Sequence, residues 1–92
     1  MFELVIRMGV RRGEVQILID VLNTSMNGVK VTHLMYRTNL SYSTLRKYMS
    51  ASLRQGLISK VSGSDGSVMY YTTDKGRLLL GRLKEVKLTL RV

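Results

Sequence analysis

The stretch from Ser41 to Gly56 carries the residues whose types and spacing could do chemistry. On a helical wheel at about 100° per residue, one side is apolar and the opposite side carries only hydroxyl groups and cations. Such side chains bind phosphates and hydrogen-bond the edges of nucleic-acid bases. This pattern predicts a surface that contacts a polyanion; the alternative is an ordinary solvated helix face. The cationic, hydroxyl-rich stripe consists of Ser43, Lys47, Ser50 and Arg54.

The helix that positions this stripe has its own start and stop signals. Ser41 can cap the free N–H groups of the first turn, and Gly56 favours the left-handed conformation that ends a helix. Residues 41–55 are therefore predicted to form a helix with its other side against a core. That core side consists of Leu45, Tyr48, Met49, Ser52 and Leu53.

A shorter helix is predicted directly before it, at residues 32–38, with Thr32 as its cap. The segment Thr38-Asn39-Leu40 reads as the connection between the two helices. Two helices joined this tightly form a helix-turn-helix, whose second helix usually enters the major groove of DNA.

The distribution of charge also indicates a polyanionic partner. The chain has 15 Lys and Arg residues against 6 Asp and Glu, a formal net charge of +9, and no acidic residue lies between Asp20 and Asp65. An unopposed cationic window attracts nucleic acid, and phosphate contact requires only positive charge at the right distance. The residues predicted to contact double-stranded DNA are Lys30, Thr32, Arg37, Ser41, Ser43, Thr44, Arg46, Lys47, Ser50, Arg54 and Lys60.

The remaining segments predict a scaffold for these two helices within one domain, residues 1–92. A first helix is expected at 13–26, a β-hairpin with Asp-Gly in its turn at 57–72, and a last helix, capped by Thr73, at 73–90. Residues 1–9 are expected to form a strand or an N-terminal extension. The order predicts an α+β fold, mainly α: a winged helix-turn-helix with a β-hairpin wing and an added C-terminal helix.

Two apolar stripes predict a homodimer. The last helix repeats apolar residues with the 4-3-4 spacing of a helix-pairing seam, while its other leucines, Leu78, Leu80 and Leu88, can pack inward. Ile17 and Val21 project from the opposite side to the core stripe of the first helix and need a cover, which could be the N-terminal segment, the last helix or another subunit. The alternative is that the seam closes the monomer's own core. The predicted interface is Ile17, Val21, Leu79, Leu83, Val86 and Leu90.

The same sequence argues against several other classes of protein. There is no cysteine, and a lone His33, expected on a helix surface, cannot supply a metal cluster. No paired carboxylates, activated nucleophile or phosphate-cradling glycine loop suggests an enzyme, a cofactor or a small-molecule ligand. The opening MFELVIRMG predicts neither a signal peptide nor a membrane span, so a cytoplasmic, nucleoid-associated protein is expected. Tyr36, Tyr48, Tyr70 and Tyr71 could stack on bases, but core packing is their expected role.

From Lys30 to Tyr42 and on through LRKYMSASLRQGLI, the sequence resembles the small archaeal winged-helix DNA-binding proteins. That family includes a basic chromatin protein of the Sulfolobales and related transcription regulators, some carried by viruses and plasmids. The resemblance implies a winged-helix fold, double-stranded DNA binding and dimerisation through the last helix. It rests on Thr32, Leu34-Met35-Tyr36, Asn39-Leu40-Ser41-Tyr42, Lys47-Tyr48-Met49, Gly56-Leu57-Ile58, Thr73 and Gly76.

Three functions follow as hypotheses. The first is a transcriptional regulator that binds as a homodimer, favoured because the wing and the coiled coil are reduced relative to the chromatin protein. The second is an architectural protein that binds DNA without sequence preference. The third is a winged-helix module whose basic face meets an acidic protein. Membrane-surface binding by the Leu- and Lys-rich last helix is a further, weaker alternative.

Overall fold

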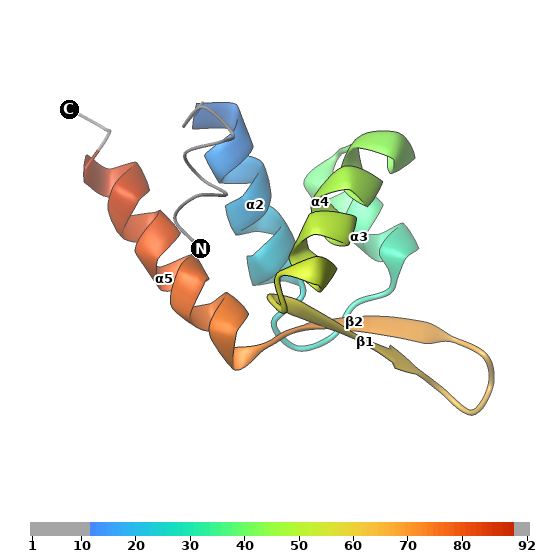
Figure 1. Ribbon diagram of the computed structural model, residues 1–92. Coiled ribbons are helices and arrows are strands. Elements are labelled where there is room, and N and C mark those ends of the chain that lie inside the picture. Colours follow the sequence, from blue (N-terminus) through green and yellow to red (C-terminus); the bar gives the residue numbers. More distant parts are fainter. Residues whose placement is uncertain (1–11, 90–92) are drawn as a thin grey trace.

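The computed structural model describes residues 12–89 and shows a mainly helical winged helix, as predicted (Figure 1). The predicted N-terminal strand and Leu90 lie outside the described residues. Two strands form an antiparallel hairpin, which lies in the chain between the last two of the described helices. The elements are α2 Arg12–Thr24, α3 Val31–Thr38, α4 Tyr42–Arg54, β1 Ile58–Ser62, β2 Val68–Thr72 and α5 Asp74–Thr89.

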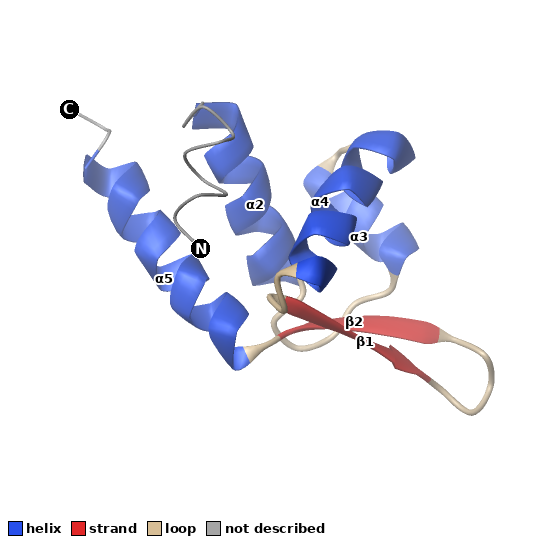
Figure 2. Cartoon of the chain, viewed as in Figure 1, coloured by secondary structure: helices blue, strands red, loops and turns tan. Residues whose placement is uncertain are grey.

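Helix α2 occupies the middle of the molecule. It packs against α5 on one side and against α3 on the other, and the hairpin runs below the helices with its tip projecting beyond them (Figure 2). Every described helix contributes to one continuous core, in which each buried Leu or Ile stabilises the fold by about 1.5–3 kcal/mol. The buried apolar residues are Val15, Leu18, Ile19, Val21, Leu22, Val29, Leu34, Leu45, Met49, Leu57, Ile58, Leu79, Leu80 and Leu83.

The predicted dimer interface is wrong for Val21, Leu79 and Leu83. All three are fully buried within this one chain, because α2 and α5 cover each other, so their side chains are not on a surface that a partner could reach. Ile17 is also partly buried against the core, and Val86 is half-buried. The structure therefore shows the alternative for these residues: the apolar stripe of the last helix packs into the core of its own chain.

The other leucines of α5 divide differently from the prediction. Leu80 packs inward as expected, but Leu78 and Leu88 are 62% and 66% exposed. The inward side of α5 is therefore formed by Leu79, Leu80 and Leu83, and its opposite side keeps two large apolar side chains in solvent.

Local signals set the ends of α4. The Ser41 hydroxyl accepts a hydrogen bond from the Thr44 N–H at 3.2 Å, which confirms the predicted N-cap. The Gln55 N–H donates to the Ala51 carbonyl, and Gly56 follows with a φ of 71°, a conformation that glycine adopts without strain. These ends fix which side of α4 faces the core.

The start of α3 corrects the prediction. Lys30, and not Thr32, is the N-cap residue, and its side chain makes no capping hydrogen bond. Thr38 belongs to α3 and donates to the Leu34 carbonyl at 2.7 Å, so the connection between the two helices is Asn39 to Ser41. Asn39 has a φ of 55°, and this left-handed C-cap residue ends α3.

The first turn of α5 is bonded to the turn that follows α4. The Thr73 hydroxyl donates to the Gly56 carbonyl at 2.6 Å, the Thr73 N–H donates to the Leu57 carbonyl at 2.9 Å, and Lys75 Nζ donates to the Gln55 carbonyl at 2.7 Å. Thr73 also accepts from the Gly76 N–H at 3.1 Å, which confirms it as a cap. A Cβ on Gly76 would collide with the Leu57 carbonyl, so this close approach requires glycine.

The hairpin pairs β1 and β2 in register from Ile58 opposite Thr72 to Ser62 opposite Val68. Val29, ahead of α3, exchanges two backbone hydrogen bonds with Tyr70 at 3.0 and 2.8 Å. The Thr72 hydroxyl donates to the Leu22 carbonyl at 2.6 Å, which joins the end of the hairpin to α2. The hairpin is thus fixed at its base to two other elements.

Candidate nucleic-acid interface

The outward side of α4 carries the predicted cationic stripe. Leu45, Met49 and Ser52 turn into the core, which leaves the opposite side of the same helix in solvent. A shallow open hollow of about 500 Å³ lies on this side. We call the residues that line it the α4 face: Tyr42, Ser43, Arg46, Lys47, Ser50 and Arg54.

The α4 face contains all four residues of the predicted stripe, together with Arg46 beside the stripe and Tyr42 at the start of the helix. Apart from the half-buried Thr44, the predicted contact residues of α4 are exposed. The hydroxyl groups of Ser41 and Thr44 bond each other at 3.0 Å within the helix cap. These two hydroxyls therefore stabilise the helix start. The Ser43 hydroxyl, which lies on the outward face, is also hydrogen-bonded to the Ser41 hydroxyl at 3.3 Å, and Ser50 lies on the same face two turns further along.

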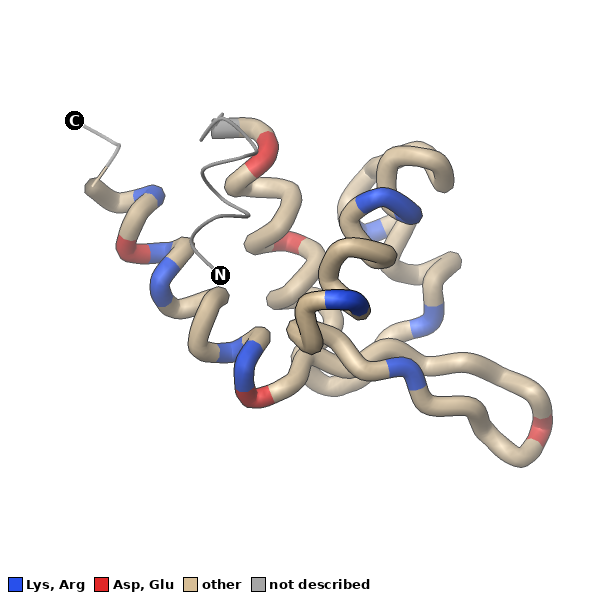
Figure 3. The backbone as a smooth tube through the Cα atoms, in the orientation of Figure 1, with Lys and Arg blue, Asp and Glu red and all other residues tan. Residues whose placement is uncertain are grey.

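The other predicted contacts surround this face but do not line it. Lys30 is the exposed residue before α3, Thr32 and Arg37 are exposed on α3, and Lys60 is exposed on β1, opposite Tyr70 in the hairpin register. Figure 3 shows these cations distributed over α3, α4 and the hairpin, with a single acidic position, at the hairpin tip. In this part of the structure the exposed charges are therefore positive except for Asp65.

A second, narrower hollow of about 220 Å³ separates α4 from the sheet. We call it the crevice; Tyr70 of β2 and Val31 of α3 line it across from α4. Tyr42, Arg46 and Ser50 line both hollows, so they form a ridge between the α4 face and the crevice. The remaining lining residues are Leu45, Met49 and Leu53.

The acidic group at the hairpin tip is held by its neighbours. The Asp65 carboxylate accepts hydrogen bonds from the Ser67 hydroxyl at 2.6 Å and from the Ser67 N–H at 3.1 Å. These bonds, with a smaller contribution from the charge of Lys30, lower the pKa of Asp65 from its ordinary value of 3.8. The tip therefore carries a full negative charge at neutral pH, which disfavours its approach to phosphates.

The tyrosines fall into two groups. Tyr48 and Tyr70 pack partly buried against the core as predicted, and burial, followed by the charge of Glu14, raises the pKa of Tyr48. Tyr36 is 83% exposed, so the prediction of core packing is wrong for that residue. Tyr42 is 53% exposed on the α4 face, although it is not among the contacts predicted from the sequence. On the helical wheel it lies between Met49 and Leu53, on the apolar side, so the pattern gave no signal of its exposure.

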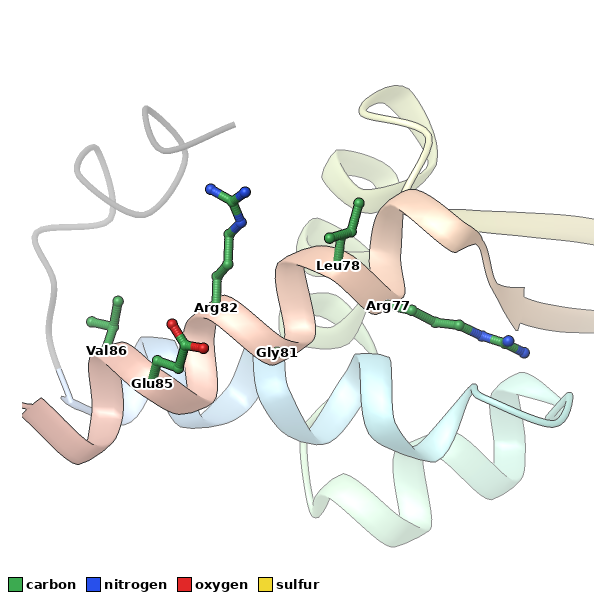
Figure 4. A pocket seen from close by; sticks show the side chains of 6 residues that line it. All are labelled: Arg77, Leu78, Gly81, Arg82, Glu85 and Val86. Carbon is green, nitrogen blue, oxygen red and sulfur yellow. The ribbon is translucent and has the colours of Figure 1, made fainter.

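A third open hollow, of about 470 Å³, lies on the outward side of α5 (Figure 4). Leu78, Arg82 and Val86 project from one side of the helix there, and Glu85 lies beside them. We call this surface the α5 face, lined by Arg77, Leu78, Gly81, Arg82, Glu85 and Val86. It differs from the α4 face in combining apolar groups with both signs of charge.

Within residues 12–89, no cluster of His, Cys, Asp or Glu side chains could hold a metal ion. None of the helices in that part of the chain is long and apolar enough to cross a membrane. His33 is exposed on α3, as expected.

The element order, the buried side of α4 and the hairpin base define a winged helix-turn-helix. The model of the family described as winged helix-turn-helix matches residues 11–91, and the chain belongs to this family. It is a family of DNA-binding domains and not of enzymes.

Particular proteins are similar to this chain. An uncharacterized protein of Methanocaldococcus jannaschii is 35% identical over 78 residues, which cover 84% of this chain but 35% of that protein. The chain thus spans about a third of the length of this relative. Among solved structures, Sso10a-2, a DNA-binding protein from Sulfolobus solfataricus, superposes with a TM-score of 0.76 at 25% identity, over 87% of this chain and 82% of that one.

A transcriptional regulator of the MarR family from Silicibacter pomeroyi also has this fold. It superposes with a TM-score of 0.71 at 19% identity, over 92% of this chain and 57% of that one. The similarity to an archaeal winged-helix DNA-binding protein confirms the resemblance drawn from the sequence.

Proposed function

We propose that the protein binds double-stranded DNA by placing the α4 face in the major groove. The observation that carries this proposal is the composition of that face: Arg46, Lys47 and Arg54 stand in solvent beside two serine hydroxyls. No acidic residue lies between Asp20 and Asp65 to oppose them. An α-helix fits the major groove, and the second helix of a helix-turn-helix usually enters it.

Within this arrangement, the residues divide into two roles. Arg46 and Arg54 can bind a guanine through two parallel hydrogen bonds, while Ser43 and Ser50 discriminate poorly between bases. Lys30, Arg37 and Lys60 lie on elements that flank α4 and would neutralise phosphates on either side of the groove. We infer that the hairpin contributes through Lys60 and not through its tip, where Asp65 is ionised.

We infer a transcriptional regulator, because two arginines on the α4 face supply more base recognition than phosphate binding alone requires. The similarity to Sso10a-2, a DNA-binding protein, supports the binding of DNA. An architectural role follows if the serines and lysines carry most of the contact, since such contacts are independent of sequence.

We further propose a homodimer that pairs through the α5 face and not through the buried leucines. Leu78 and Leu88 are large apolar side chains that are exposed to solvent on the outward side of α5. Val86, which lies between them in the sequence, is half-buried. At Gly81, apart from the backbone of α5 itself, no atom of residues 12–89 lies within 4 Å of the position that a Cβ would occupy, so a second helix could approach closely there. Pairing would bury this apolar surface.

The DNA proposal is tested by titrating the pure protein onto random double-stranded DNA at several salt concentrations. A steep decrease of affinity with salt is expected, because cations on three elements would release counterions from phosphates. Selection from a randomised pool then distinguishes the two roles: an enriched motif supports a regulator, and no enrichment supports an architectural protein. No binding at low salt would overturn the proposal in favour of a protein-interaction module.

The dimer proposal is tested by light scattering on a sizing column. Leu78→Glu combined with Leu88→Glu should convert a dimer into a folded monomer, whereas Lys84→Glu, another exposed position on α5, should leave the dimer intact. A wild-type protein that is already monomeric would remove the dimer from the proposal.

A further inference from the structure

Tyr42 is the first residue of α4, and its environment is unlike that of the other tyrosines. Its ring is 53% exposed and lines both the α4 face and the crevice. Tyr48 and Tyr70, by contrast, pack against the core. Core packing therefore does not account for an aromatic ring at position 42.

Exposure alone does not indicate a role, since Tyr36 is more exposed still. What separates the two residues is their surroundings. Tyr36 lies on α3 outside the α4 face, whereas Tyr42 lies one helical turn before Arg46 on the ridge that both hollows share. Tyr42 is thus the apolar member of a surface that otherwise presents cations and hydroxyls.

The position of Tyr42 along α4 also matters. The N-terminal residues of a recognition helix are the ones that reach base edges, and Tyr42 is the N-terminal residue of α4. In the major groove, the apolar group that bases present is the 5-methyl of thymine. A half-exposed ring at the tip of the helix matches that group, whereas the cations beside it match phosphates and guanine.

We propose that Tyr42 is a specificity-determining residue that selects thymine by packing its ring against the 5-methyl group. This rests on the proposed insertion of α4 into the major groove. The contact is made by the ring carbons, so the phenolic hydroxyl is dispensable. Arg46, one turn later, would then bind a base or phosphate next to that thymine.

The experiment compares two duplexes of the same sequence, one with thymine and one with deoxyuridine at every thymine position. Deoxyuridine lacks the 5-methyl group and keeps the pairing with adenine. Wild-type protein should bind the deoxyuridine duplex about fourfold more weakly for each methyl contacted, as expected for the loss of one buried methyl group. The measurement is fluorescence anisotropy at fixed salt.

Three variants determine which group reads the methyl. Tyr42→Phe should keep the preference for thymine, because the ring remains, whereas Tyr42→Ala should bind both duplexes equally. Tyr36→Ala is the matched control, an exposed tyrosine outside the α4 face, and should behave as wild type. Circular dichroism verifies that each variant is folded.

The outcomes separate this inference from the proposed function. Equal wild-type affinity for the two duplexes would overturn the inference while DNA binding stands, and so would a thymine preference that persists in Tyr42→Ala. Loss of the preference in Tyr42→Phe would assign the contact to the hydroxyl and also overturn it. Failure of the wild type to bind either duplex would overturn the proposed function itself.

Discussion

The outward sides of α4 and α5 offer a direct comparison, because both helices bury leucines on one side and expose the other. On the α4 face the exposed charges are all positive, and Tyr42 is its large apolar member. On α5, the exposed side combines Leu78 and Leu88 with Glu85 and several cations (Figure 3). The two surfaces lie on opposite sides of α2 (Figure 1).

This difference indicates what each surface can bind. A polyanion repels any carboxylate near it, so a face without acidic groups suits nucleic acid. A protein partner instead removes apolar groups from water and tolerates charges of both signs at the rim of the contact. The net charge of the chain does not describe either surface. What distinguishes them is that the α4 face carries only positive charges, whereas the outward side of α5 combines apolar groups with charges of both signs.

The largest effect is expected from the inward side of α5. Leu83→Ala should lower the free energy of unfolding by about 2–5 kcal/mol, because it removes a fully buried side chain and leaves a cavity. Leu78→Ala, on the outward side of the same helix, should change it by less than about 0.5 kcal/mol. Urea denaturation measures both variants under conditions in which the protein is monomeric. Equal losses would contradict the orientation of α5.

The second prediction compares the cations of the two faces. Lys47→Ala with Arg54→Ala should weaken DNA binding by about ten- to a hundredfold and reduce the salt dependence by about two units of slope. Arg77→Ala with Lys84→Ala removes the same charge from exposed positions on α5 and should leave affinity nearly unchanged. If both pairs weaken binding alike, net charge and not the α4 face would determine affinity.

Two glycines of α5 provide a third test. Gly76→Ala should destabilise the fold by about 1–3 kcal/mol, because the new methyl group would overlap the Leu57 carbonyl. Gly81→Ala should stabilise the monomer by about 0.5–1 kcal/mol, since the position is open and alanine favours the helix. Thermal unfolding at low protein concentration measures both. A loss of stability at Gly81 would show that the α5 face is covered within the monomer.

The smallest effect concerns the hairpin tip. The pKa of Asp65 is lower in the folded chain than its ordinary 3.8, so its contribution to stability is present above that value and is lost as the pH falls through the folded-state pKa. An NMR titration should therefore give a midpoint below 3.8, and Asp65→Asn should remove the pH dependence in this window. The same variant should bind DNA slightly more tightly. A midpoint at or above 3.8 would contradict the hydrogen bonds to Ser67.

The sequence predicted the orientation of α4 correctly but assigned the apolar stripe of α5 to the wrong partner, and this difference has a physical reason. For α4, the cap at Ser41, the stop at Gly56 and the division into two sides are all local properties, and the sequence predicted them correctly. For α5, the spacing of Leu79 and Leu83 is the same whether the stripe meets α2 of its own chain or a second copy. Only the tertiary packing distinguishes these cases, and it places both residues in the monomer's core.

Two further residues show related limits of the sequence pattern. Val21 lies off the main stripe of α2, but a helix in the middle of the molecule is covered from more than one side, which a single-stripe pattern does not anticipate. Tyr42 lies toward one margin of the apolar side of α4, between Met49 and Leu53 on the wheel, yet it is exposed at the start of the helix, where the core does not cover it. The spacing of residues therefore predicted burial better for residues in the middle of an apolar or polar stripe than for residues at its margin.

The bonds between Thr73, Lys75 and the turn after α4 have a mechanical consequence. Three successive carbonyls, of Gln55, Gly56 and Leu57, are held by the first turn of α5, and Gly76 permits the contact to be close. The end of α4 and the start of α5 are therefore joined directly by these hydrogen bonds. A tilt of α5 against α2 would be transmitted to α4, so any event that reorients one helix also changes the angle at which the other presents its outward side.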